Sequence, residues 1–277
     1  MRILIVGGSG FIGKSLTAYL ANEGYVVSAT SFKTFSQNRL DASSLSELDA
    51  FFRVNTFDCI INLAGSMAGI FRINECASSN IVQVLDNLGQ TSKVIHVASS
   101  TEFQSVQNTY ESEYSFSKEV GTTKFQDAIL TSSISGMTLF LHNTYGEYQP
   151  KNRFIAYCIE TLKVGKAVEL KFPNRVRDFV FQPDVNKSFT RALEDLENNN
   201  SEQSMIREIG TGLGTSLHNA VLVIADAMDC KRDNLVRDMQ TEIDLHPHRV
   251  ANIQSKLTYT CGTGLREGIG RIAGGLL

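Results

Sequence analysis

Apolar positions in the first half of the chain alternate between short continuous runs and longer stretches with helical periodicity. Residues 2–6 (RILIV) and 93–99 (KVIHVAS) are almost uninterrupted in their apolar character, which is typical of strands buried on both faces. Residues 10–24 (GFIGKSLTAYLANEG) have the spacing of a helix that ends at Gly24. Further strands are expected at residues 25–30, 58–64 and 137–143. This alternation predicts an α/β fold with a doubly wound parallel sheet.

The pattern changes after Asn143, where the elements become shorter and more polar. Residues 154–166 (FIAYCIETLKVGK) predict a helix, and residues 167–172 (AVELKF) predict a short strand. Residues 177–185 (RDFVFQPDV) then lead into a helix at 186–197. We therefore predict two domains: a larger one formed by 1–142 with 178–207, and a smaller, interrupted C-terminal one formed by 143–177 with 208–277.

A glycine-rich turn follows the first predicted strand. Gly7, Gly10 and Gly13 have the spacing GxxGxxG and lie directly between a strand and a helix. The first glycine permits a tight turn, the second lets the backbone approach a pyrophosphate, and the third lets the helix pack closely on its strand. The helix N-terminus attracts the phosphate charge. At this place in the chain the triplet predicts a dinucleotide-binding turn rather than a merely structural one.

The end of the second predicted strand bears on which dinucleotide binds. Proteins of this architecture that prefer NAD often have an acidic residue there, which holds the ribose hydroxyls. Here Ser31 stands at the strand end and Lys33 follows shortly after, so the sequence favours NADP. NAD stays the alternative, because Lys33 also fits a solvated loop charge. Asp41 is expected either to meet the adenine edge or to cap the helix that follows it.

The composition of the chain argues against several other classes of function. The formal net charge is −3, with 42% hydrophobic and 20% charged residues, which gives no electrostatic reason to expect nucleic acid or an anionic membrane as a partner. No apolar run approaches the length of a membrane span, and the N-terminus does not resemble a signal peptide. We therefore expect a cytoplasmic protein. No metal site is expected, because the five cysteines are scattered without ligand spacing: Cys59, Cys76, Cys158, Cys230 and Cys261.

A tyrosine and a lysine four residues apart form a candidate catalytic pair. Tyr114 and Lys118 lie in a predicted helix, where this spacing puts both side chains on one face. The phenol of free tyrosine has a pKa of about 10, too high for proton transfer at neutral pH, and a neighbouring ammonium lowers it. The alternative is an ordinary aromatic residue beside an ordinary surface charge. The motifs around the pair decide between the two interpretations.

Nine motifs are spread over nearly the whole chain: GGSGFIG (7–13), NLAG (62–65), Asn80, ASS (98–100), YSFSK (114–118), NTYGE (143–147), RDFVFQPDV (177–185), IGTGLGTSL (209–217) and SKL…GLREGI (255–269). Together they resemble the short-chain dehydrogenase/reductase superfamily. The likeness is closer to its extended branch, the NAD-dependent epimerase/dehydratase family, which acts on nucleotide sugars. The resemblance implies a Rossmann-type larger domain that binds NAD(P) and a smaller domain that binds the nucleotide sugar.

The resemblance also implies a role for particular side chains. Tyr114 would donate a proton to a carbonyl oxygen while NAD(P)H delivers hydride, and Lys118 would also bind the nicotinamide ribose. In the family a hydroxyl four residues before an aromatic residue holds that oxygen. Counting back from Phe103 selects Ser99, with Ser100 in reserve.

The same resemblance implies the binding residues. Cofactor binding is expected of Gly7, Gly10, Phe11, Ile12, Gly13, Ser31, Lys33, Asp41, Leu63, Ala64 and Gly65, together with Tyr114 and Lys118. Substrate binding is expected of Ser100, Asn143, Arg153 and Arg177, with Arg175 a weaker candidate. The guanidinium of Arg177 would grip the diphosphate of a nucleotide-diphosphate sugar; the alternative is a salt bridge with Asp178 or another acid. A homodimer fits the resemblance, because family members often pair two helices per subunit.

Four reactions of the family have to be separated. The 4,6-dehydratases carry an Asp-Glu pair after the catalytic hydroxyl, and Ser100 and Thr101 stand at those positions here. Epimerases and decarboxylases usually retain NAD and have larger substrate domains. Residues 152–162, 176–185 and 210–217 look like those of CDP-abequose-synthase-like 4-ketoreductases. We therefore expect NADPH-dependent reduction of the C4 ketone of a nucleotide-linked 4-keto-6-deoxyhexose. An NAD-retaining epimerase and a non-catalytic NAD(P)-sensing protein are the alternatives.

Overall fold

The computed structural model describes residues 1–32, 38–67, 71–102, 112–199, 202–230, 233–241, 244 and 248–273. The chain divides into two compact units. Unit 1 contains residues 1–103, 110–140 and 189–207, and unit 2 contains residues 104–109, 141–188 and 208–277. Residues 178–188 therefore group with unit 2, whereas the sequence suggests that they belong to the larger domain. The assignment of cofactor to one domain and substrate to the other stays a prediction.

A seven-stranded sheet runs in the order β12-β9-β5-β4-β3-β1-β2. Its strands are β1 (Arg2–Val6), β2 (Val26–Thr30), β3 (Cys59–Asn62), β4 (Lys93–Ser99), β5 (Gly136–Leu141), β9 (Ser204–Gly210) and β12 (Thr258–Thr260). β1 pairs in parallel with β2 on one side and with β3 on the other, and β3 pairs in parallel with β4. β1 and β3 are fully or almost fully buried in their apolar side chains, as the uninterrupted runs predict. This confirms the doubly wound α/β fold.

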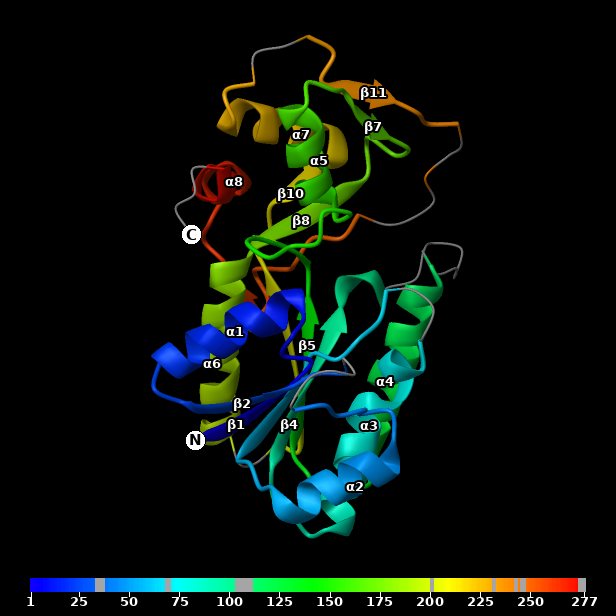
Figure 1. Ribbon diagram of the computed structural model, residues 1–277, viewed down its shortest axis with the longest axis vertical. Helices are drawn as coiled ribbons and strands as arrows, with labels where there is room; N and C mark the ends of the chain where they lie inside the picture. Colours follow the sequence, from blue (N-terminus) through cyan, green and yellow to red (C-terminus); the bar gives the residue numbers. More distant parts are fainter. Residues whose placement is uncertain are drawn as a thin grey trace. The chain divides into compact units, whose positions relative to one another are not determined.

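Helices cover both faces of the sheet in unit 1 (Figure 1). α1 and α6 lie on one face, and α2, α3 and α4 lie on the other. Their bounds are α1 (Phe11–Asn22), α2 (Leu45–Val54), α3 (Arg72–Asn87), α4 (Glu113–Leu130) and α6 (Gln182–Asn198), and a 3-10 turn, η1, spans Ser100–Glu102. α6 begins four residues before the predicted start, because Pro183 is tolerated in the first turn of a helix. The core on the α2–α4 face is built from residues such as Leu48, Phe52, Ile81 and Phe125.

The order in which strands are added to the sheet reverses at β1, although β1, β2 and β3 all run parallel. The connection that leaves β2 passes over β1 and returns as β3 on its other side. In open α/β sheets, ligands bind outside the carboxyl ends of the strands at such a switch point. The carboxyl ends of β1 and β3 are therefore the place at which the fold favours a dinucleotide.

The described part of unit 2 contains two small sheets and three helices of its own, besides β12 and the start of α6. Its elements are β6 (Asn143–Tyr145), β7 (Val168–Leu170), β8 (Val176–Phe181), β10 (Gly214–Ser216), β11 (Val236–Asp238), α5 (Phe154–Lys163), α7 (Leu217–Ala227) and α8 (Leu265–Ala273). β8 pairs in parallel with β6 and antiparallel with β10, and β11 pairs in parallel with β7. A separate core forms around Tyr145, Ile159, Phe181, Ile224 and Ile269.

Candidate functional site

The glycine turn joins the carboxyl end of β1 to α1. Gly7 adopts a φ of 89°, and the N–H groups of Gly7 and Gly8 both donate to the carbonyl of Thr30 (3.1 and 2.9 Å). A Cβ on Gly13 would lie 2.4 Å from the carbonyl oxygen of Gly7, so only glycine lets α1 approach the turn this closely. Gly10 precedes α1 without a side-chain cap, and the first turn of α1 holds no acidic residue.

This uncapped start of α1 fits an anionic ligand. The first N–H groups of a helix need an acceptor, and the helix dipole favours negative charge at that end. Gly10 has no side chain to obstruct the approach of a ligand to this backbone, and a Cβ there would meet only the carbonyl oxygen of Gly7, at 3.3 Å. The residues present therefore suit the pyrophosphate of a dinucleotide, and Phe11 and Ile12 supply N–H groups of the first turn.

The end of β2 presents hydroxyl groups and no carboxylate. The hydroxyls of Ser31 and Ser9 are 2.7 Å apart, which joins the strand end to the glycine turn. Ser31 also forms a parallel β-bridge with Arg39. The guanidinium of Arg39 lies 2.9 Å from the carboxylate of Glu47 and stacks over the ring of Phe32. Lys33, the cation expected from the sequence, lies outside the described residues.

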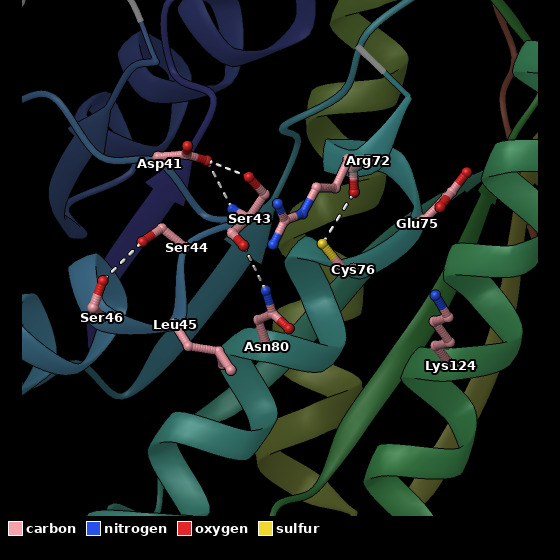
Figure 2. A pocket seen from close by; sticks show the side chains of 10 residues that line it. All are labelled: Asp41, Ser43, Ser44, Leu45, Ser46, Arg72, Glu75, Cys76, Asn80 and Lys124. Carbon is pink, nitrogen blue, oxygen red and sulfur yellow. Dashed lines mark hydrogen bonds between the residues drawn. The ribbon is translucent and has the colours of Figure 1, made fainter.

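Asp41 has a clear structural role ahead of α2. Its carboxylate accepts hydrogen bonds from the N–H (2.9 Å) and the hydroxyl (2.7 Å) of Ser43, while Ser44 caps α2 through the N–H of Glu47. Asp41 and Ser43 also line a polar groove of about 760 Å³ (Figure 2). The described residues that line it are Asp41, Ser43, Ser44, Leu45, Ser46, Arg72, Glu75, Cys76, Asn80 and Lys124. The turn role is thus established, and contact with adenine stays a prediction.

The loop after β3 lies against the glycine turn. Leu63 donates its N–H to the carbonyl of Val6 (2.8 Å), and a Cβ on Gly7 would come within 2.8 Å of the Ala64 nitrogen. Leu63, Ala64 and Gly65 therefore flank the same carboxyl end as Gly7. A dinucleotide bound at the glycine turn would need this loop beside the turn.

Asn74 fixes that loop to α4. Its amide oxygen accepts from Ser66 N–H (2.8 Å), and its amino group donates to the Ser66 carbonyl (2.8 Å) and to the Ser117 hydroxyl (2.9 Å). Ser117 in turn donates to the carbonyl of Tyr114 (2.8 Å). Asn74 was not identified from the sequence, because a single buried asparagine in a helix has no distinctive pattern.

Tyr114 and Lys118 lie in the first turns of α4, which Ser112 caps through the N–H of Ser115. Lys118 is only 6% exposed, and its ammonium donates to the carbonyl of Val97 near the end of β4 (2.7 Å). Burial lowers the pKa of Lys118 from its ordinary value, and the carboxylate of Glu102 opposes that shift. A lysine in this position is not an ordinary surface charge. Tyr114 is half-buried.

Ser99 and Ser100 differ in exposure. Ser99 ends β4 and is half-buried, and its hydroxyl lies 2.8 Å from that of Thr101. Ser100 begins η1 and is buried. The hydroxyl of Ser99 is thus the more accessible of the two. Phe103, from which Ser99 was counted, lies outside the described residues.

Unit 2 holds Asn143, Arg153 and Arg177 of the predicted substrate residues, whereas Ser100 lies in unit 1. Arg177, on β8, is 4% exposed and donates to the carbonyl of Val176 (2.9 Å). The carboxylate of Asp178 points elsewhere and accepts from the N–H and hydroxyl of Thr211 (3.0 and 2.5 Å). Asn143 lies on β6, and Arg153 is exposed at the start of α5.

Arg249 is a second buried arginine beside Arg177. The two residues form a parallel β-bridge, and Arg249 is 2% exposed. Arg175, by contrast, is held in a two-pronged ion pair with Asp244 (2.7 Å for each bond) and stacks over Phe172. Sequence reasoning named Arg175 and missed Arg249, because 72 residues separate Arg249 from Arg177 and only the fold brings them together.

No helix in the described part of the chain has both the length and the apolar content needed to cross a membrane. The described residues also contain no group of three or more histidine, cysteine, aspartate or glutamate side chains that could hold a metal ion.

Comparison with known proteins identifies relatives over most of the chain. Residues 3–206 match the model of the NAD dependent epimerase/dehydratase family. The chain is 24% identical to dTDP-6-deoxy-L-talose 4-dehydrogenase (NAD(P)(+)) of Kitasatospora kifunensis, over 82% of this chain and 79% of that protein. It is 22% identical to CDP-abequose synthase of Salmonella typhimurium, over 82% of this chain and 80% of that protein.

Among solved structures, UDP-glucose 4-epimerase of Thermus thermophilus in complex with NAD superimposes with a TM-score of 0.78. The two proteins share 19% identity, over 99% of this chain and 98% of the epimerase. At this identity the likeness concerns the fold.

Proposed function

The chain belongs to the NAD-dependent epimerase/dehydratase family, and from that premise we propose that it reduces the C4 ketone of a nucleotide-linked 4-keto-6-deoxyhexose with NADPH. The observation that carries the proposal is the buried ammonium of Lys118. Lys118 lies on the same helix as Tyr114, and its ammonium donates to Val97 near the end of β4, the strand that ends at Ser99. Burial strengthens the electrostatic effect of this ammonium on neighbouring groups, and the carboxylate of Glu102 balances its charge. The relatives named above include a sugar 4-dehydrogenase and a CDP-sugar synthase, which supports the same class of reaction.

The proposed catalytic trio consists of Ser99, Tyr114 and Lys118, and each residue has a defined task. Tyr114 donates its phenolic proton to the carbonyl oxygen as charge develops there. Lys118 stabilises the resulting phenolate electrostatically, and Ser99 donates a hydrogen bond that fixes the same oxygen. When bound, the reduced nicotinamide supplies the hydride that the carbonyl carbon accepts.

The surroundings of the trio favour reduction over dehydration. A dehydratase needs a free acid and a free base to remove a proton and expel water. Glu102 is the carboxylate of the η1 turn, and both its oxygens accept hydrogen bonds from the protein, from Ser99 N–H (2.6 Å) and from the Thr122 hydroxyl (2.7 Å). A carboxylate that is buried and occupied in this way is poorly suited to attack substrate.

For the substrate, the proposal assigns the diphosphate to Arg177 and adds Arg249. Guanidinium groups suit paired anionic oxygens, and the β-bridge between Arg177 on β8 and Arg249 brings two buried arginines to neighbouring positions. Asn143 and Arg153 are proposed as further contacts of the nucleotide sugar. A homodimer and a cytoplasmic location stay predictions.

The choice of NADP rests on Ser31. Ser31 stands at the strand end, where an acid would hold the ribose of NAD, and its hydroxyl is paired with that of Ser9. Arg39 forms a β-bridge with Ser31, and its guanidinium pairs with Glu47. A cofactor of this kind is exchanged at each turnover, as a reductase requires. An epimerase instead retains its NAD through the whole catalytic cycle.

Ser31→Asp is expected to reverse the preference between the two cofactors. The new carboxylate repels a 2′-phosphate and accepts from a 2′-hydroxyl, so the Kd for NADPH should rise by at least about 10-fold and the Kd for NADH should fall. Fluorescence titration of the reduced cofactors measures both constants. Gln83→Glu, an exposed site on α3 that gains the same charge, is the control and should change neither Kd by more than about 2-fold. A rise in NADPH affinity in Ser31→Asp would contradict the assignment.

Cofactor content and turnover separate the alternatives. The purified protein should contain little bound NAD and should oxidise NADPH when a CDP-, dTDP-, GDP- or UDP-linked 4-keto-6-deoxyhexose is added. Retained NAD with interconversion of C4 epimers and no net NADPH oxidation would identify the epimerase instead. Tight NADPH binding with neither activity on any of these sugars would identify a sensing protein.

A further inference from the structure

A buried carboxylate beside the proposed catalytic lysine has no part in the reaction as described so far. Glu102 ends η1 and is 4% exposed. One oxygen accepts from the backbone N–H of Ser99, and the other accepts from the hydroxyl of Thr122 on α4. Glu102 therefore ties the turn that carries the catalytic hydroxyl to the helix that carries Tyr114 and Lys118.

Glu102 is also the end of a chain of buried polar side chains. The chain runs from the end of β3 through α3 and β4 to α4 and η1: Asn62, Ser78, His96, Thr122 and Glu102. Asn62 donates to Ser78 (2.7 Å), and Ser78 lies 2.7 Å from Nδ1 of His96. Nε2 of His96 lies 2.9 Å from the hydroxyl of Thr122, which lies 2.7 Å from the carboxylate of Glu102. Every member is buried, so the protons have no competing water partners in this chain.

The proton positions in this hydrogen-bond chain can be assigned from its first member. The backbone N–H of Ala64 can only donate, so the Asn62 atom that faces it at 3.0 Å is the amide oxygen. The amino group of Asn62 then donates to Ser78, whose own proton has Nδ1 of His96 as its acceptor within the chain. A neutral imidazole that accepts at Nδ1 carries its proton on Nε2 and donates it to Thr122.

The same reasoning applies to Thr122 and Glu102, at the other end of the hydrogen-bond chain. Thr122 accepts from His96 and has one proton, which it must donate to Glu102. The other oxygen of Glu102 faces the N–H of Ser99, which also donates. With Glu102 ionised, each bond of this chain has one donor and one acceptor, and both hydroxyl protons have a partner within it. A protonated Glu102 would donate to Thr122 and would leave the proton of Thr122 or of Ser78 without a partner in the chain. The bond pattern therefore favours an anionic Glu102.

Charged neighbours act on Glu102 in opposite directions. The pKa of Glu102 is raised overall, because burial and the charge of Glu119, on α4, outweigh the Lys118 ammonium and the bonds from Thr122 and Ser99, which lower it. Burial and then Lys118 hold the pKa of His96 well below its ordinary value, so the imidazole is neutral at neutral pH. Lys118 is thus the cation that balances the buried carboxylate.

We propose that Glu102 is a positioning residue for the reduction: its carboxylate holds the turn that carries Ser99 and balances the charge of Lys118. Through the hydrogen-bond chain it also links the loop Leu63–Gly65, on the cofactor side, to the catalytic hydroxyl. This role rests on the proposed function only in naming the reaction that the turn serves. The bond pattern itself does not depend on which sugar is reduced.

Glu102→Gln tests the role in turnover. A carboxamide has one accepting atom, so either the bond from Ser99 or the bond from Thr122 must be lost. We expect kcat to fall about 10- to 100-fold while KM for the sugar changes by less than about 3-fold. Removal of the negative charge also lowers the pKa of Lys118, so the alkaline limb of the kcat profile should move to lower pH. A merely structural role would lower kcat without moving that limb.

Glu119→Gln is the matched control. It removes the same charge one residue from Lys118, and it should leave kcat within about 2-fold and the alkaline limb in place. If Glu102→Gln leaves the profile where it is, or if both variants shift it equally, the positioning role is wrong.

A second measurement decides the bond pattern without turnover. In wild-type protein labelled with ¹⁵N histidine, with His96→Gln used for assignment, His96 should give the neutral tautomer protonated at Nε2 across neutral pH. A tautomer protonated at Nδ1, or a charged ring, would overturn the proton order and with it the anionic Glu102. If wild-type protein reduces no 4-keto sugar but His96 shows the Nε2–H form, the proposed function fails while the anionic Glu102 stands.

Discussion

Tyr114→Phe is expected to lower kcat by about 10²- to 10⁴-fold, because the substitution removes the only proton that the mechanism transfers to the carbonyl oxygen. The phenyl ring fills the same space, so the fold and the start of α4 should be unchanged. The Kd for NADPH should stay within about 3-fold of wild type, since Lys118 still donates to Val97 and the glycine turn is untouched. Stopped-flow oxidation of NADPH and fluorescence titration measure the two effects separately.

Tyr157→Phe is a suitable control for this substitution. Tyr157 lies on α5 in unit 2 with its ring 37% exposed, and loss of its hydroxyl should leave kcat unchanged. Wild-type turnover in Tyr114→Phe would remove Tyr114 from the mechanism. Loss of NADPH binding together with turnover would mean that the phenol serves binding and not proton transfer.

Gly121→Ala is expected to cause the largest loss of stability among single methyl additions. Gly121 lies on α4 where that helix crosses α3, and a Cβ there would come 2.0 Å from the carbonyl oxygen of Asn74. The contact is with backbone, so the two helices must move apart. Overpacking of this kind costs about 1–3 kcal/mol or more, and we expect about 3 kcal/mol with a Tm about 6–12 °C lower.

The same substitution at Gly270 separates packing from helix propensity. Gly270 lies in α8, and a Cβ there would meet nothing within 4 Å. Gly270→Ala should therefore leave Tm unchanged or raise it, because alanine is the better helix former. Differential scanning calorimetry of both variants measures the contrast. Equal Tm values for wild type and Gly121→Ala would contradict the close approach of α3 and α4.

The parts of the site that follow local rules could be predicted from the sequence. The glycine turn depends on backbone conformation over seven residues, and the placement of Tyr114 and Lys118 on one helix depends on a spacing of four. Both signals are short and are therefore readable along the chain. The burial of Lys118 was not among them, because it depends on how α4 packs against β4.

The long-range contacts could not be predicted in this way. Arg249 meets Arg177 only because a strand-like segment near the C-terminus returns to β8. The chain that ends at Glu102 joins β3, α3, β4, α4 and η1, and each of its polar residues alone looks like an ordinary buried serine, threonine or histidine. The residues of such a network have no regular spacing along the sequence, so a sequence pattern does not reveal the network.

Transfer of deuterium tests the central claim most directly. NADPH that carries deuterium on both faces of the nicotinamide C4 is incubated with the enzyme and a nucleotide-linked 4-keto-6-deoxyhexose, and the product sugar is analysed by mass spectrometry and NMR. The account predicts one deuterium per product, located at C4 of the hexose, with one NADPH consumed for each sugar reduced. If the 4-keto sugar is recovered unreduced and NADPH is not consumed, while the same enzyme interconverts the C4 epimers of a nucleotide-linked 4-hydroxy hexose without taking up deuterium, the reductase is contradicted and a redox-neutral epimerase is identified.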